Sequence, residues 1–172
     1  GVIYASGSAK VSVSNSSLSN NTAKNFGGAI DFRSSGASSI TNTIIEGNTS
    51  KKGAAINVAG TGELTINGCT IKNNIASDKG GAIFTENKSK INVYENTLFE
   101  GNSALTGGAA YIDGGAKLTI DKAIFDENIA RVEGLNALYT KLKEDDQMEW
   151  VQRMGNIEAR AREMVCKEII YN

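Results

Sequence analysis

The residues that could perform acid–base or calcium-assisted chemistry are scattered along the chain. Cleavage of a glycosidic bond needs two carboxyl groups at a fixed separation, and a calcium site needs several oxygen ligands. Asp31, Asp113 and Asp121 stand at different places relative to the repeated motifs described below, and Arg33 is the only arginine before residue 131. The dense acidic run at 144–146 lies beyond those motifs. The sequence therefore predicts no catalytic residues and no metal ligands.

Nucleophilic and zinc chemistry are also disfavoured. The chain contains no histidine, which excludes Ser/His/Asp and Cys/His sites and any zinc site that needs an imidazole. Its two cysteines, Cys69 and Cys166, lie in segments of different character and lack metal-type spacing. We interpret both as small space-filling residues rather than a disulfide, and we expect no cofactor and no enzymatic activity.

Charge and hydropathy argue against two classes of partner. Eighteen basic and nineteen acidic residues give a net charge of −1, so the chain lacks the basic surface that nucleic-acid binding requires. Its apolar runs stay well short of the roughly 18 residues of a membrane-spanning helix. We expect neither nucleic-acid binding nor membrane insertion.

Short motifs recur along the first 130 residues at a nearly constant interval. One consists of two small residues, an alanine and an apolar residue, as in "NFGGAIDF" at 25–32 and "DKGGAIF" at 78–84. Another places an asparagine three residues after an apolar residue, and a short strand of alternating apolar residues precedes it. The asparagines are spaced 27, 26, 28 and 26 residues apart: Asn21, Asn48, Asn74, Asn102 and Asn128.

This periodicity predicts a stacked architecture. Three short strands per period leave no room for helices, and a single unit cannot bury an apolar face alone. If each period forms one coil, equivalent strands pair in parallel about 4.8 Å apart, with right-handed connections. We therefore predict an all-β solenoid, a right-handed parallel β-helix of about five coils of about 27 residues each, over residues 1–131.

Stacking gives each motif a structural role. The small-residue step predicts a corner that needs positive φ or close backbone approach, at Gly27, Gly28, Gly53, Gly80, Gly81, Gly107 and Gly108. Ile30, Ile56 and Ile83 should point inward as one column. The five asparagines should form an internal ladder, in which each amide satisfies a turn and the amide of a neighbouring coil.

The same residues carry a family resemblance. "GGAI" at 27–30 and 80–83, "FEGN" at 99–102 and "FDEN" at 125–128 are similar to the GGA(I/L/V) and FxxN repeats of the chlamydial polymorphic outer membrane proteins and of related bacterial surface proteins. The resemblance covers residues 1–130, with departures at Ala54, at Ala110 and in three asparagine motifs where Leu or Ile replaces Phe. It implies a β-helix displayed outside a cell, often in adhesion, and it does not imply catalysis.

The character of the chain changes after Ala130. Seventeen of the nineteen glycines precede this point, and helix-forming residues dominate after it. Two helices are predicted, at about 133–143 and 146–168. One amphipathic face of the second should provide its packing residues, Trp150, Met154, Ile157, Ala161 and Met164. Residues 132–172 are predicted to form either a helical cap on the last coil or an independent appendage.

This C-terminal segment has a resemblance of its own. It is similar to the C-terminal end of the TnpV family of transposon-encoded proteins, notably at Asp146, Trp150 and Met154. That resemblance implies that a mobile element entered a surface-protein gene. It implies no particular chemistry.

The sequence as a whole favours a binding module over an enzyme. Variable turns on a rigid coil suit binding, and the turn and outward residues that vary between coils are Lys51, Lys52, Asp78, Lys79, Glu86, Lys88 and Lys90. With the first resemblance, this predicts an extracellular or cell-surface adhesin-like module, a fragment or a short form of a bacterial surface protein, that binds a protein or glycan ligand. Two alternatives stay open: a cytoplasmic, mobile-element protein with a protein-binding scaffold, and a polysaccharide-acting β-helix enzyme.

Overall fold

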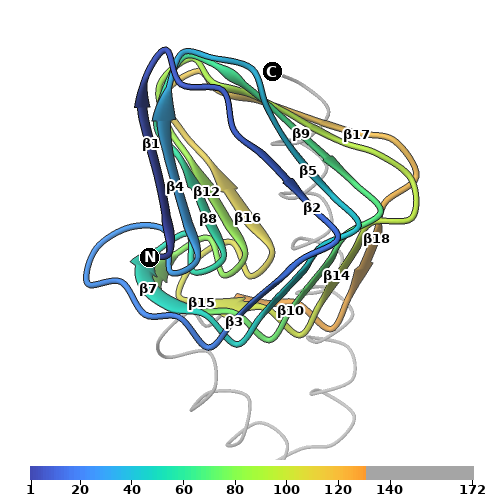
Figure 1. Ribbon diagram of the computed structural model, residues 1–172. Coiled ribbons are helices and arrows are strands. Elements are labelled where there is room, and N and C mark those ends of the chain that lie inside the picture. Colours follow the sequence, from blue (N-terminus) through green and yellow to red (C-terminus); the bar gives the residue numbers. More distant parts are fainter. Residues whose placement is uncertain (131–172) are drawn as a thin grey trace, which may run out of the picture. The chain divides into compact units, whose positions relative to one another are not determined.

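A computed structural model describes residues 1–130, which form one structural unit built from parallel strands (Figure 1). The chain visits the strands of successive sheets in turn, so each strand pairs with its equivalents one coil before and one coil after. No helix occurs within residues 1–130. The predicted all-β parallel solenoid of about five coils is therefore confirmed. The predicted helices, their packing residues and the boundary of the C-terminal segment lie outside the described residues.

Four sheets make up the coil. The first sheet contains β1 (Ile3–Gly7), β4 (Ile30–Ser34), β8 (Ile56–Val58), β12 (Ile83–Thr85) and β16 (Ala110–Ile112). The second contains β2 (Ser12–Ser14), β5 (Ser38–Thr41), β9 (Glu63–Asn67), β13 (Lys90–Val93) and β17 (Lys117–Ile120). The third contains β3 (Ser17–Ser19), β6 (Ile44–Glu46), β10 (Thr70–Lys72), β14 (Leu98–Glu100) and β18 (Ile124–Asp126). The fourth contains β7 (Thr49–Lys52), β11 (Ile75–Lys79), β15 (Ser103–Ala104) and β19 (Ile129–Ala130).

The fourth sheet corrects the expectation of three strands per period. Its strands follow the ladder asparagines and turn small residues inward, including Ala76 and Ala104, which are fully buried. β11 also carries a register irregularity between Ala76 and Lys79. Strands this short, with serine and alanine inside, show no apolar alternation from which they could be recognised.

Inward side chains of the other three sheets stack in apolar columns. In the first sheet, Ile30, Ile56 and Ile83 are paired in register and are 0% exposed. In the third sheet, the rings of Phe99 and Phe125 stack with centroids 4.7 Å apart. Burial of each large aliphatic side chain contributes roughly 1.5–3 kcal/mol, so the columns supply the main attraction between coils.

The glycine corners show both properties that the motif predicts. The first glycine of each pair has a positive φ, and the second lies too close to backbone atoms for a Cβ. Gly80 has a φ of +65°, and a Cβ there would lie 2.2 Å from the carbonyl oxygen of Ile83. Gly81 has no positive φ, but its Cβ would lie 2.0 Å from the carbonyl oxygen of Gly108 in the next coil. The remaining corner glycines, Gly27, Gly53 and Gly107 of the first kind and Gly28 and Gly108 of the second, show the same two constraints.

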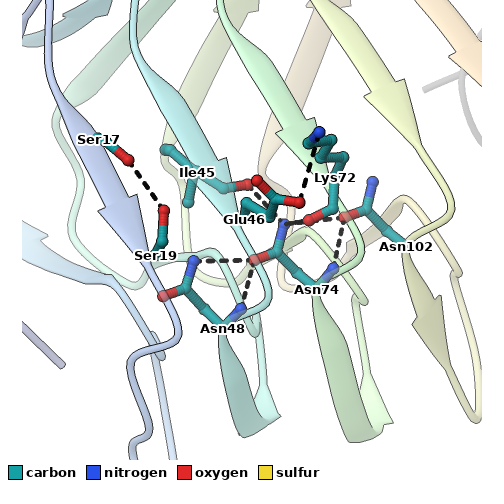
Figure 2. A network of polar contacts seen from close by, with 8 residues as sticks. All are labelled: Ser17, Ser19, Ile45, Glu46, Asn48, Lys72, Asn74 and Asn102. Atoms are coloured by element: carbon teal, nitrogen blue, oxygen red, sulfur yellow. Dashed lines mark hydrogen bonds and ion pairs between the residues drawn. The ribbon is translucent and has the colours of Figure 1, made fainter.

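The five asparagines lie in one column and bond in one direction. The Nδ2 group of each of the first four donates to Oδ1 of its equivalent one coil further along the chain, at 3.0 Å (Asn21–Asn48), 2.9 Å (Asn48–Asn74), 2.9 Å (Asn74–Asn102) and 2.8 Å (Asn102–Asn128). Figure 2 shows three of them, whose side chains are fully buried. The accepting Oδ1 also takes the backbone N–H of the preceding asparagine, as at Asn48 and Asn74. The amide therefore replaces strand pairing where the chain turns.

Each ladder amide also binds backward along the stack. Asn74 Nδ2 donates to the carbonyl oxygen of Ile45 at 2.9 Å, and Asn102 Nδ2 donates to that of Ile71 at 2.8 Å. One side chain thus connects three successive coils. A buried amide left without these partners costs about 1–3 kcal/mol for each unsatisfied group.

Two columns of left-handed residues flank the third sheet, and the sequence motifs do not reveal them. One holds Asn15, Asn42, Gly68, Asn96 and Lys122, and the other holds Asn20, Gly47, Asn73, Gly101 and Glu127, all with φ between 47° and 64°. Asparagine tolerates this conformation better than most residues. The fixed interval between the two columns sets the two turns that enclose the third sheet.

Cys69 belongs to a column of hydroxyl-bearing residues. Thr43 donates its hydroxyl to the carbonyl oxygen of Thr41 at 2.8 Å, and the Cys69 thiol makes the equivalent contact with Asn67 at 3.3 Å. Cys69 is 0% exposed. Burial raises the pKa of its thiol, although the backbone contacts at Thr43 and Asn67 oppose the rise. This placement agrees with the expected space-filling role.

Replacing Asn74 with alanine should lower the free energy of unfolding by about 3 kcal/mol or more, because several buried partners lose their bonds at once. Urea denaturation followed by circular dichroism measures the change. Asn67→Ala removes a side chain of the same type from an exposed position and should change stability by less than about 0.5 kcal/mol. Equal losses for both variants would contradict a structural role for the ladder.

Gly80→Ala should destabilise the protein more than Gly7→Ala. Both glycines have nearly the same positive φ, but a Cβ at Gly7 meets no atom within 4 Å. Gly7→Ala should therefore show only the conformational cost of about 1–2 kcal/mol, whereas Gly80→Ala adds a clash with backbone. Thermal unfolding of the two variants separates these contributions, and a larger loss for Gly7→Ala would refute the corner geometry.

The buried thiol should make stability fall at alkaline pH. An unfolded thiol has a pKa of about 9, so above that pH the unfolded chain loses a proton that the folded chain retains, which favours unfolding. Between about pH 8 and pH 10, wild type should lose more stability than Cys69→Ser, which keeps the contact and cannot ionise there. Parallel pH profiles for the two proteins would contradict this.

Candidate functional site

Within residues 1–130 the inward side chains pack into buried clusters, so in this part of the chain a ligand can reach the outer faces. Within residues 1–130, no group of three or more histidine, cysteine, aspartate or glutamate residues is placed to hold a metal ion. In the same part of the chain, no helix has the length and hydrophobicity needed to cross a membrane.

The three aspartates that could act in catalysis do not form one cluster: two have different hydrogen-bond partners, and the third lies beside another sheet. Asp31 accepts the Nε–H of Arg33, with the atoms 3.0 Å apart, and Asp113 accepts the backbone N–H of Gly114 at 2.8 Å. Asp121 follows β17 in the second sheet, away from the sheet that carries Asp31. The structure thus brings none of these carboxylates together as an acid–base pair.

Outward residues of the first sheet form a mixed polar and aromatic column. Strand pairing places them in the order Tyr4, Asp31, Asn57, Phe84 and Tyr111. Although Asn57 and Phe84 point away from the core, they are only 0% and 1% exposed. Other side chains must therefore cover this part of the outer face.

The cover comes from residues that immediately precede the glycine corners. Phe26, Lys52, Lys79 and Thr106 stand in this position, and backbone bridges align them from coil to coil. The Phe26 ring lies 6.3 Å from that of Phe84, two coils away, and therefore spans the coil of Asn57 between them. Lys52 Nζ lies 5.0 Å from the Phe84 ring centroid and 5.8 Å from that of Phe26.

We name this cluster the Phe26 corner; it comprises Phe26, Asp31, Arg33, Lys52, Asn57 and Phe84. Arg33 contributes twice, because its guanidinium lies 4.9 Å from the Phe26 ring centroid and also pairs with Asp31. Asn57 Nδ2 donates to Asp31 Oδ1 at 2.6 Å. Asn57 Oδ1 is buried and has no hydrogen-bond partner within residues 1–130. The corner thus combines two cations, a carboxylate and an unsatisfied acceptor.

A second cation–aromatic contact lies further along the same columns. Lys79 Nζ donates to the Tyr111 hydroxyl at 3.0 Å and lies 4.3 Å from the centre of that ring. The hydrogen bond with Tyr111 is the main cause that raises the pKa of the Lys79 ammonium group. The rings of Phe84 and Tyr111 stack at 5.9 Å, so a continuous aromatic strip joins this contact to the Phe26 corner.

The predicted variable residues divide into three groups. Lys52 and Lys79 lie on the aromatic strip, whereas Lys51, Lys88 and Lys90 are exposed. The half-buried acids among the predicted residues are Asp78 and Glu86. The structure therefore does not gather the seven residues into one site.

The repeated motifs do not reveal the Phe26 corner, because the residue type changes from coil to coil in the two columns that form it. The available signal was the change of residue type before the corner glycines, where Phe26 is followed one and two periods later by lysine. Chemically, the corner can bind through ion pairs, hydrogen bonds and ring contacts. Its one carboxylate, that of Asp31, is paired with Arg33.

Comparison with known proteins agrees with this architecture. Residues 1–140 match the family model described as the right-handed β-helix region. Searches of curated proteins and of solved structures found no match. The match covers most of the chain and establishes the right-handed coil, and the chain therefore belongs to the right-handed β-helix family.

Proposed function

We propose that this chain is a non-enzymatic, adhesin-like binding module of a bacterial cell surface, whose ligand is a glycan or a protein on a host or neighbouring cell. The observation that carries the proposal is the Phe26 corner, where a rigid coil presents cations, aromatic rings and an unsatisfied acceptor together. Recognition sites commonly combine a rigid scaffold with such residues.

Two further considerations support the proposal. Asp31 and Asp113, two of the aspartates that could act in glycoside hydrolysis, are held by different partners, Arg33 and the backbone of Gly114. The GGA(I/L/V) and FxxN motifs are similar to those of the chlamydial polymorphic outer membrane proteins and related surface proteins, which favours display outside a cell.

The intracellular alternative draws on the likeness of the C-terminal segment to TnpV-family proteins. If the chain served a mobile element, its partner would be a cytoplasmic protein, and the solenoid would be a scaffold. Both functions use binding, so the identity of the ligand separates them.

The full chain, fluorescently labelled, should bind epithelial or bacterial cell surfaces saturably, and excess unlabelled chain should compete. Flow cytometry measures this binding, with duplex DNA and cell lysate as comparison ligands. Heat-unfolded chain is the control for non-specific adhesion. Specific binding only to a protein in the lysate would replace the surface role with the intracellular one.

The non-enzymatic part of the proposal has a separate test. Neutral and acidic polysaccharides incubated with the full chain, with and without calcium, should release no new reducing ends and no unsaturated products. Cleavage above the level of a heat-inactivated sample would contradict it.

A further inference from the structure

We infer that the Phe26 corner binds a carboxylate-bearing sugar of an acidic oligosaccharide; this inference rests on the proposed binding function and names its ligand class. The corner brings together positive charge, an unpaired hydrogen-bond acceptor and an aromatic ring.

Local charge favours an anion although the whole chain is close to neutral. Lys52 has no acidic side chain within 4.0 Å among residues 1–130, so its ammonium group is held by two aromatic rings alone. Lys24 and Lys51 are exposed in adjoining segments that pair across coils. Against Lys24, Lys51, Lys52 and Arg33 stand two carboxylates, Asp31 in the corner and Asp78 in the strand that pairs with the segment of Lys51.

The acceptors argue for a ligand that also carries hydroxyl groups. Asp31 already accepts from Arg33 and Asn57, whereas Asn57 Oδ1 has no donor, and a simple anion such as sulfate supplies none. An acidic sugar offers hydroxyl donors beside its carboxylate. Its carboxylate can pair with the Lys52 ammonium while a ring hydroxyl donates to Asn57 Oδ1.

Phe26 fits the same ligand in a different way. Its ring lies over the coil of Asn57 and is only half-buried, and it belongs to a segment joined to the next coil by isolated bridges. In this inference, Phe26 and the neighbouring Lys52 side chain move aside together to uncover the Asn57 acceptor. The ring also offers an apolar face to the C–H groups of a sugar, so Phe26 would both cover the empty site and contact the ligand.

The test compares acidic with neutral sugars on the intact chain. Isothermal titration calorimetry with sialyllactose and a hyaluronan hexasaccharide should detect binding, whereas lactose and inorganic sulfate should bind at least about tenfold more weakly, because each lacks one of the two required interactions. Binding should weaken as salt is added, since ion pairing contributes to it. Equal affinity for lactose or for sulfate would overturn the assignment.

Variants locate the site. Lys52→Gln should reduce affinity for the acidic sugars about tenfold, and Asn57→Leu should reduce it through loss of the acceptor. The matched control is Lys90→Gln, which makes the same change at an exposed position on the second sheet and should bind like wild type. Thermal unfolding curves identify any variant that fails to fold, and the conservative Lys52→Arg change should retain binding if charge is what matters.

The outcomes also separate this inference from the proposed function. If the full chain binds cell surfaces and Lys52→Gln binds them equally well, the surface function stands and the Phe26 corner is not its site. If acidic sugars bind at the corner but cells do not, the site stands and the adhesive role fails.

Discussion

The constraint on which the structure depends is that every coil must satisfy its polar groups through the coils next to it. Strand backbones do this by parallel pairing, but pairing is interrupted wherever the chain turns. The asparagine ladder solves the problem at one turn, because each amide accepts from one neighbour and donates to another. A fully satisfied polar column inside an apolar core also fixes the register, since a shift by one residue would leave several buried groups unpaired.

The other columns follow from that register. Once Asn48, Asn74 and Asn102 are aligned, the isoleucines of the first sheet are aligned too, and the glycines fall where the backbone needs a left-handed residue or close approach. Cys69 shows how tolerant the arrangement is, because a thiol takes the place of a hydroxyl with the same acceptor geometry. A position of the repeat therefore requires a chemical group of one kind, here a hydrogen-bond donor, and more than one residue type can supply it.

These relations explain what could be predicted from the sequence. The coil count, the isoleucine column and the asparagine ladder are properties of one repeated unit, so the period alone locates them. The fourth sheet could not be recognised, because strands such as Ser103–Ala104 are too short and too small in side chain to show alternation. The Phe26 corner depends on a contact between Phe26 and Phe84 across two coils, and no comparison of equivalent positions identifies such a pair. Departures from the repeat, rather than the repeat itself, make the candidate site.

The direction of the hydrogen bonds has a mechanical consequence. In residues 1–130 nearly all bonds between coils run along the stacking axis, and each strand of a coil contributes only two to five residues to its sheet. A load applied across the ends of this stack would act parallel to these bonds. It would break them one coil at a time instead of shearing many bonds together. Such a stack lengthens by roughly one unwound coil for every step, and it would absorb tension gradually when a tethered molecule is dragged by flow.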